Sequence, residues 1–390
     1  MAVSRFEDPP TAIRPVQYRD LGAIEALLDR AVSAEGGDGR ATPEPWLRQK
    51  QRWLRVLPVL RWLPPAAQRD WRAYVAERAG QIAGFIKVSP ANKARSTWQI
   101  DCLLADAAAS RQTVGSQLIR HCLEAIGEAR TWLLEVNISD RDTLALYRQN
   151  GFQPLAQMTD WAIPPQSLAQ LAQREPQLPN LLPVNNVDAQ LLYQLDTAAM
   201  PPLLRQAFDR HVRDFKTGPW EAAAQQLQQW WHASHRLQGY VFEPQRKAAI
   251  GYLQLQVARD GEQAADLTVH PAYTWLYPEL LAYMARAARP AQVLQLRSAD
   301  YQPEREAYLA QIGAQQTEQT LLMSRSVWHK LREAKANSLA RLQLSEVLQG
   351  LQPGGGTPVP GRMVGANRKR PTERELAAIA AQPADSLPPR

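Results

Sequence analysis

The stretch Ser139–Phe152, SDRDTLALYRQNGF, decides how the surrounding sequence is interpreted. A serine followed three residues later by Asp142 is typical of a helix start, and Gly151 suits the position just after a helix. The spacing predicts an eleven-residue helix over 140–150 that carries Tyr147 in its last full turn. An ordinary strand–helix unit with a half-packed tyrosine would give the same pattern, so the segment alone does not imply catalysis.

Strands alternate with helices on both sides of this segment. The apolar run TWLLEVN predicts a buried strand over 132–137, and another strand at 97–105 leads to a helix at 114–129. Strands alternating with helices predict an α/β fold with a partly parallel sheet. The other expected strands are short and lie at 13–16, at 73–77, at 81–88 and, as a last pair, within 152–162.

Landmarks of this half recur further along the chain in the same order, at a slowly drifting offset. IRPVQYRD at 13–20 is matched by LLPVNNVD at 181–188, and Asn150-Gly151-Phe152 is matched by Ile312-Gly313-Ala314. Gly84 and Gly251 also correspond, as do Leu103 and Leu267. The ordered set predicts a duplicated domain, with a period far too long for a solenoid repeat.

The predicted organisation therefore has two domains and a tail. Prolines mark the linker, and the last part of the chain is too rich in glycine and proline to bury a core. The predicted parts are a domain at 10–163 with a basic insertion at 40–70, a linker at 164–180, a second domain at 181–330, a helix at 331–351 and a disordered basic tail at 352–390.

The first half resembles the GNAT superfamily of N-acetyltransferases. The second signature of that family pairs LY with GF, which stand here as Leu146-Tyr147 and Gly151-Phe152, and the preceding LEVNISD is similar to the LEVR-SN pattern of ribosomal-protein alanine N-acetyltransferases. The resemblance covers 13–162. It implies two GNAT-like domains, each a mixed twisted sheet flanked by helices. It also implies acetyl transfer from acetyl-CoA to the primary amine of a small molecule or of a peptide or protein N-terminus.

In this family a loop of pattern Arg/Gln-x-x-Gly-x-Gly/Ala feeds a helix N-terminus, whose backbone N–H groups bind the coenzyme A pyrophosphate. Here Gly115 keeps the second glycine, whereas Thr113 replaces the first and Ser110 replaces the usual Arg/Gln. Arg111 partly supplies the lost charge. The resemblance thus gives as cofactor-binding residues the strand end Leu104 and Ala105, which would also offer an amide to the acyl group, and the run Ser110, Arg111, Gln112, Thr113, Val114, Gly115 and Ser116.

The family reaction needs a base, a backbone N–H for the carbonyl oxygen and an acid for the leaving thiolate. By motif the acid is Tyr147. Asp101 and Glu135, on the two neighbouring strands, are both candidates for the base, although either carboxylate could equally form a structural ion pair. A β-bulge, which family members often have in the first of these strands, would exchange its faces.

The second half keeps the predicted order of strands and helices, but it lacks the loop glycines and the candidate acid. Tyr277 and Glu279 occupy the two glycine positions of its loop, and a carboxylate there would repel a pyrophosphate. Leu309 stands where the first half has Tyr147. We therefore expect a GNAT-like fold without catalysis in residues 181–330.

The insertion carries the segment 45–65, PWLRQKQRWLRVLPVLRWLPP, in which basic residues alternate with apolar ones and no acid occurs. Three interpretations stay open. The segment could be a packed helical hairpin with a solvated basic rim, a lid over the acceptor site, or a patch for a membrane surface or an acidic partner.

Composition limits the other classes of function. The 45 Lys and Arg exceed the 38 Asp and Glu, but the excess sits in 40–70 and 331–390, so it gives no strong nucleic-acid signal. No apolar run reaches the length of a membrane span. The two cysteines, Cys102 and Cys122, exclude a disulfide framework and a cysteine-based metal site, and they favour a reducing cytoplasm.

Two functions of different classes remain. The LY and GF pairs and Gly115 favour an acetyl-CoA-dependent N-acetyltransferase. Thr113 and the missing catalytic glutamate signature favour a non-catalytic binding or scaffold protein that binds coenzyme A weakly or not at all.

Overall fold

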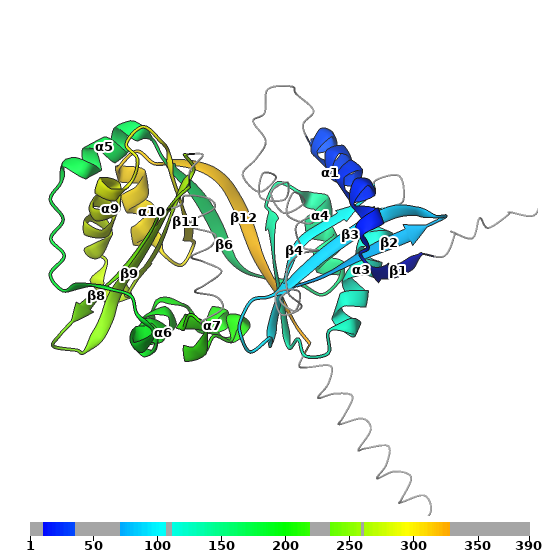
Figure 1. The fold of residues 1–390 in the computed structure, drawn as a ribbon, viewed down its shortest axis with the longest axis horizontal. Coiled ribbons are helices and arrows are strands. Elements are labelled where there is room, and N and C mark those ends of the chain that lie inside the picture. The colour runs from blue at the N-terminus through cyan, green and yellow to red at the C-terminus, as the bar shows by residue number, and fades with distance from the viewer. Residues whose placement is uncertain (1–10, 36–70, 107–110, 219–234, 259–260, 328–390) are drawn as a thin grey trace, which may run out of the picture. The chain divides into compact units, whose positions relative to one another are not determined.

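The computed structural model describes five stretches of the chain: 11–35, 71–106, 111–218, 235–258 and 261–327 (Figure 1). All of them belong to one compact unit that spans Met1–Glu333. The predicted basic insertion, the helix at 331–351 and the tail lie outside the described residues.

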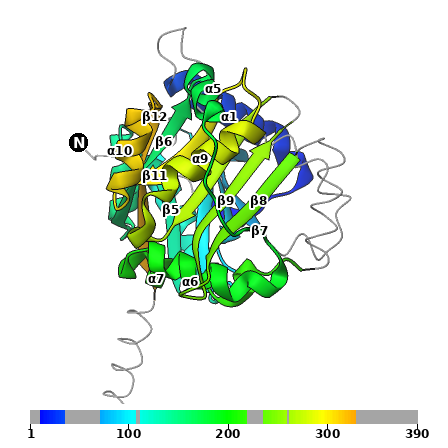
Figure 2. The ribbon, with the colours of Figure 1, turned by 90° about the vertical axis from the view of Figure 1, so that its left-hand side faces the viewer.

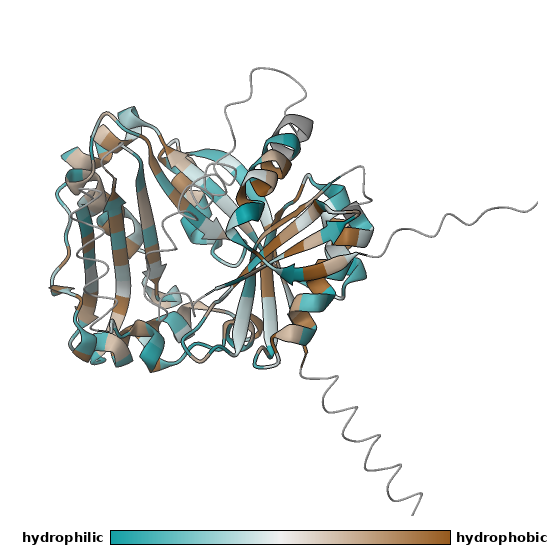
Figure 3. Cartoon of the chain, turned by 45° about the vertical axis from the view of Figure 1, so that its right-hand side comes forward, coloured by the Kyte–Doolittle hydropathy of each residue, from teal (hydrophilic) through white to brown (hydrophobic). Residues whose placement is uncertain are grey.

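The first half contains a strand–helix alternation in which apolar side chains cover both faces of the strands. Trp98 and Trp132 are fully buried between strands and helices, while Val75 packs against Ile24 of the first helix on the opposite face. Figure 3 shows apolar positions recurring along these strands. The elements are β1 (Ala12–Pro15), α1 (Leu21–Glu35), β2 (Arg72–Arg78), β3 (Gln81–Pro90), β4 (Thr97–Ala105), α3 (Arg111–Ala125), β5 (Thr131–Asn137), α4 (Arg141–Gln149) and β6 (Gln153–Ile163).

The second half repeats this order. Its core forms where Leu280 and Met284 of α9 meet Leu253 of β9, and Figure 2 shows α9 lying across these strands. The elements are α5 (Pro165–Gln173), β7 (Leu181–Pro183), α6 (Ala189–Ala199), α7 (Pro202–Phe208), β8 (His235–Glu243), β9 (Ala248–Val257), β10 (Gln263–Val269), α9 (Leu276–Ala287), β11 (Leu294–Ala299), α10 (Pro303–Gln311) and β12 (Gln315–Ser326).

The described strands form a single twelve-stranded sheet in the order β1-β2-β3-β4-β5-β12-β6-β11-β10-β9-β8-β7. The pairs β4–β5 and β10–β11 are parallel, and all other pairs are antiparallel. The last strand of each half is exchanged: β12 pairs with β5 of the first half, and β6 pairs with β11 of the second. These two exchanged strands also pair with each other at the centre of the sheet.

The predicted fold class, α/β with two GNAT-like halves, is confirmed, and two local predictions are wrong. Residues 152–162 do not form a strand pair, because the partner of β6 is β12 from the other half. The helix cap is not Ser139, since the Asp140 carboxylate accepts the Thr143 N–H at 3.0 Å. The proposed boundary between the halves stays a prediction, since the sheet runs through it.

In the part of the chain that the structure describes, no helix is both long and apolar enough to cross a bilayer.

Candidate active site in the first half

An opening lies between β4 and β5. Their parallel pairing runs only from Thr97 opposite Thr131 to Ile100 opposite Leu134, although β4 continues to Ala105. Beyond the last pair the two strands diverge, so backbone groups of β4 that face β5 have no strand to pair with. Such unpaired groups are available to a ligand that enters between the strands.

A β-bulge at Asp101 sets the direction of the strand at this opening. Lys87 of β3 pairs with Cys102, whereas Val88 pairs with Ile100, so Asp101 is the extra residue. Its carboxylate forms an ion pair with the Lys87 ammonium at 3.0 Å and accepts the Ser89 hydroxyl at 2.9 Å. This candidate base is therefore held on the β3 side of its strand.

The ladder between β3 and β4 shows which backbone groups face the opening. The Asp106 N–H donates to the Ala83 carbonyl at 2.9 Å, and in an antiparallel ladder alternate residues bond to the partner strand. The backbone of Leu104 therefore faces β3, while those of Leu103 and Ala105 face the opening. Leu103 was missed from the sequence because its direction depends on the bulge.

Tyr147 is buried in α4 with 5% of its surface exposed, and its ring packs edge-to-face on Phe152. Burial raises the pKa of the Tyr147 phenol above its ordinary 10.0, and the nearby Cys102 thiol and Asp140 carboxylate raise this pKa further. Tyr147 belongs to the hydrophobic cluster against which Leu103 and Ala105 of β4 pack, so it lies beside the end of β4 that borders the opening. At neutral pH the phenol keeps its proton and can donate it.

The first turn of α3 is the second part of the candidate site. The helix begins at Arg111, so its first backbone N–H groups have no partner inside the helix and can bind an anion. Gln112 and Thr113 are exposed, and Val114 is buried in the core. Ser110 and the side chain of Arg111 lie outside the described residues.

Gly115 allows α3 and α4 to pack closely. A Cβ atom at this position would lie 2.8 Å from Leu146 Cδ2, closer than real Cβ contacts permit. The next residue, Ser116, accepts a hydrogen bond from the Asn150 amide at 2.9 Å, again between these two helices. Both residues have a packing role that does not depend on a bound phosphate.

Glu135, the other candidate base, lies on β5 just beyond the last paired residue. Its Oε2 accepts from Arg297 Nη1 at 2.7 Å, and the same guanidinium donates from Nε to Asp160 at 2.7 Å. Arg297 belongs to β11, so the second half fixes a carboxylate of the first. Asp101 and Glu135 follow directly after the last paired residues of β4 and β5, and each has its own cationic partner.

The second half has a corresponding opening, because the pairing of β10 with β11 ends at Ala265 opposite Leu296. Here Arg305, 4% exposed, donates from Nη1 to the Leu267 carbonyl at 3.2 Å. The His270 N–H bonds to β9, which by alternation turns the Leu267 carbonyl toward the opening. An arginine side chain therefore occupies this opening.

Glu279, which occupies a glycine position of the family loop, also has partners within the protein. Its carboxylate forms an ion pair with Arg174 and accepts the Gln177 N–H at 2.7 Å. Leu309 is fully buried at the position of Tyr147. The described part of the second half thus differs from the first at the opening, at a glycine position of the loop and at the position of Tyr147.

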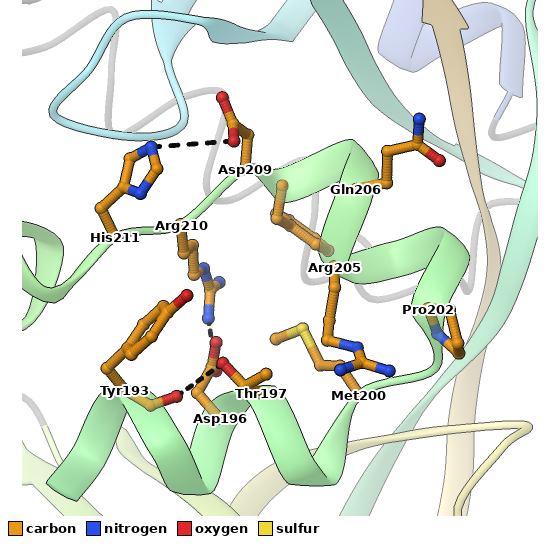
Figure 4. Close-up of a pocket in the computed structure, with 11 residues that line it drawn as sticks. Tyr193, Asp196, Thr197, Met200, Pro202, Arg205, Gln206, Asp209, Arg210 and His211 are labelled. Carbon is orange, nitrogen blue, oxygen red and sulfur yellow. Dashed lines mark hydrogen bonds and ion pairs between the residues drawn. The ribbon is translucent and has the colours of Figure 1, made fainter. Parts of the chain in front are cut away.

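A cavity of about 370 Å³ lies between α6 and α7 (Figure 4). Asp196 forms an ion pair there with Arg210 at 2.8 Å, and burial raises the pKa of Asp196 against the opposing effect of Arg210. Its lining residues belong to α6, to α7 and to the residues on either side of α7, and none belongs to β4 or β5. Sequence analysis assigned no motif to this cavity, although its lining residues all lie within 193–211.

In the described ranges, no group of His, Cys, Asp and Glu side chains could hold a metal ion.

The comparisons with known proteins agree with this geometry. Residues 69–154 match the family model of the acetyltransferase (GNAT) domain. The structure is similar to a GCN5-related N-acetyltransferase from Sphaerobacter thermophilus, with a TM-score of 0.50, 14% identity and coverage of 81% of this chain and 95% of that one. It is also similar to a tandem GNAT protein from the clavulanic acid biosynthesis pathway, without acetyl-CoA, with a TM-score of 0.51, 16% identity and coverage of 81% and 98%.

No curated protein sequence matches the chain. Residues 69–154 thus carry the GNAT domain, and the fold of the chain is similar to that of a tandem GNAT protein.

Proposed function

We propose that the first half transfers an acetyl group from acetyl-CoA to a primary amine by direct attack. The observation that carries this proposal is the protonated, buried Tyr147 beside an opening into which the backbone of Leu103 and Ala105 is turned. In the family, an acyl thioester occupies this kind of opening. The N-terminus of α3 would hold the pyrophosphate through its backbone N–H groups.

Different residues of the first half act at each step of the proposed reaction. The neutral amine attacks the thioester carbonyl carbon, and a backbone N–H of Leu103 or Ala105 stabilises the oxygen that becomes negative. The carbon–sulfur bond then breaks, and Tyr147 gives its proton to the sulfur. Both predicted carboxylates are ion-paired, Asp101 with Lys87 and Glu135 with Arg297, so these contacts favour neither of them as the base.

Thermal unfolding with and without acetyl-CoA tests the binding step. A ligand at 100 times its Kd stabilises the folded state by about 2.7 kcal/mol, so a clear rise in Tm is expected. Release of the coenzyme A thiol in the presence of a panel of primary amines tests the transfer step. No rise in Tm at millimolar acetyl-CoA would instead support the non-catalytic scaffold function.

We also propose that the protein acts in the cytoplasm. Cys102 and Cys122 are not joined in a disulfide, and Cys122 is buried with its thiol pKa raised to about 12, chiefly by desolvation. Unoxidised thiols are typical of a reducing compartment.

A further inference from the structure

The cavity between α6 and α7 has the size of a small-molecule binding site. Its volume is about 370 Å³, and such sites measure about 300–1,000 Å³. Asp196 of α6 and Arg210, which follows α7, extend toward each other in this cavity (Figure 4). Apolar and aromatic side chains also line it: Tyr193, Met200, Pro202 and Phe208.

Asp196 has one carboxylate oxygen without a partner. The residue is 8% exposed, and its Oδ1 accepts from Arg210 Nη1 at 2.8 Å. In the described part of the chain no group donates to its Oδ2. Both oxygens of a carboxylate accept hydrogen bonds, and burying one that lacks them costs free energy. Asp196 therefore favours a ligand that donates a hydrogen bond to Oδ2.

Arg210 offers hydrogen-bond donors beside that oxygen. Only its Nη1 bonds to Asp196, and no described group accepts from its Nε or Nη2. The guanidinium carbon lies 4.8 Å from the centre of the Phe208 ring, and this cation–π contact stabilises its orientation. The ion pair thus presents an acceptor and donors side by side.

The end of α7 that lines the cavity is held in place by the first half. Asn92 Nδ2 donates to the Asp209 carbonyl at 2.8 Å, and the Ser96 hydroxyl donates to the Asp209 carboxylate at 2.6 Å. A wall that is already fixed lowers the free-energy cost of ordering a site around its ligand.

A ligand with a single charge would meet a like charge in this cavity. An alkylammonium ion would lie beside the guanidinium groups of Arg205 and Arg210, and a simple carboxylate would lie beside Asp196. A zwitterion avoids both contacts when its ammonium group donates to Asp196 and its carboxylate accepts from Arg210. In an α-amino acid the two groups are bonded to one carbon, which matches the adjacent acceptor and donors.

We propose that the cavity between α6 and α7 binds a free α-amino acid with an apolar side chain. Asp196 binds the ammonium group, and Arg210 and Arg205 bind the carboxylate. The apolar side chain lies against Tyr193 and Met200. The site is separate from the opening between β4 and β5, because none of its lining residues belongs to these strands.

Isothermal titration of the full chain without acetyl-CoA tests the site, with L-leucine as the probe. Two analogues each lack one charge of the probe: L-leucinamide has no carboxylate, and 4-methylpentanoate has no ammonium group. Each analogue should bind at least about tenfold more weakly than L-leucine, as expected for a lost hydrogen bond to a charged group.

Two variants test whether L-leucine binds in this cavity. Asp196→Asn should weaken binding about 10- to 100-fold, because the ammonium group loses its charged acceptor. Arg205→Gln should weaken it about fivefold, since this side chain is exposed and solvent screens its charge. Arg213→Gln, at an exposed position outside the cavity, is the matched control and should bind as the parent does.

No heat of binding with L-leucine at millimolar concentration would overturn the proposal, as would equal affinities for L-leucine and either analogue. Binding that neither Asp196→Asn nor Arg205→Gln weakens would place the amino acid elsewhere and would overturn it as well. Should Asp196→Asn not fold, Arg205→Gln and the two analogues still decide. Because the titrations contain no acetyl-CoA, their result does not depend on the proposed acetyl transfer.

Discussion

The two openings of the sheet differ by one side chain at an equivalent helix position. Thr143 is the third residue of α4, and Arg305 is the third residue of α10. In the first half, no described side chain donates to the carbonyl of Leu103, whereas in the second Arg305 donates to the equivalent Leu267. We infer that Arg305, in the first turn of α10, closes the second opening from within.

The largest effect is expected when an arginine is introduced at the equivalent position of the first half. Thr143→Arg should close the first opening and weaken acetyl-CoA binding by about 100-fold, the equivalent of two or three lost hydrogen bonds. Thr143→Ala is the control and should bind as the parent does. Isothermal titration measures both, and equal affinities for the arginine variant and the parent would show that Arg305 is not what closes the second half.

The next prediction concerns the tyrosine that only the first half has at this position. Tyr147→Phe keeps the ring and should lower kcat about 100-fold, the lower end for general acid catalysis, because a thiol with a pKa near ~8.5 leaves partly unaided. The KM for acetyl-CoA should change little. Tyr308→Phe, in the second half, should have no effect. The measurement is steady-state kinetics under conditions where chemistry limits the rate; an unchanged kcat would rule out the acid role.

The two arginines at the openings should respond differently to removal of their charge. Burial lowers the pKa of Arg305, and its Nε and Nη2 have no partner in the described part of the chain, so folding disfavours its charge. Arg305→Met should therefore leave the free energy of unfolding within about 1 kcal/mol of the parent, or raise it.

Arg297→Met is the counterpart, and it should destabilise by about 1 kcal/mol, because Glu135 and Asp160 lose their cation while solvent screens a guanidinium that is 41% exposed. Urea unfolding of both variants measures the two changes in the free energy of unfolding. A loss of several kcal/mol in Arg305→Met alone would contradict this assignment of roles.

The smallest predicted effect is a change in Tm at the start of the first half, where Arg14 stands at the position of Leu182 in the second. The Arg14 guanidinium, bonded to Asp20 at 2.7 and 2.8 Å, holds the pKa of this carboxyl below its ordinary 3.8. Its stabilising contribution is present above the unfolded pKa of about 3.9 and is lost as pH falls through the folded pKa. Arg14→Leu, which introduces the residue found at Leu182 of the second half, should lower Tm at pH 6 by more than at pH 3. A Tm difference that does not depend on pH would contradict the linkage, and Leu182→Ala, at an exposed position, serves as control.

Local patterns in the sequence were sufficient to predict most strands and helices of the first half. The strand expected at 97–105 is β4, and the helix that carries Tyr147 spans Arg141–Gln149, because alternation and helix-end residues report on local geometry. The exchange of β6 and β12 was not predicted. A strand's own residues show which face is buried, but they do not show which distant strand it pairs with.

The candidate site was predictable only in part for similar reasons. Gly115 carries the same signal whether a phosphate or Leu146 approaches it, and the structure shows the contact with Leu146. Arg305 and Glu318 resemble surface residues in a linear sequence, since charged residues at a helix start or near a strand end are ordinarily solvated. Their burial arises from contacts between distant segments, as the 3.2 Å bond from Asn137 to Glu318 illustrates.

The exchange of end strands also constrains how the chain can be made. Synthesis proceeds from the N-terminus, and β5 obtains its second neighbour only when residues 315–326, the last strand of the unit, have left the ribosome. Until then the edge of β5 stays unpaired, and unpaired edges attract other chains. Because β12 pairs with both β5 and β6, the centre of the sheet can be completed only after the second half has been synthesised.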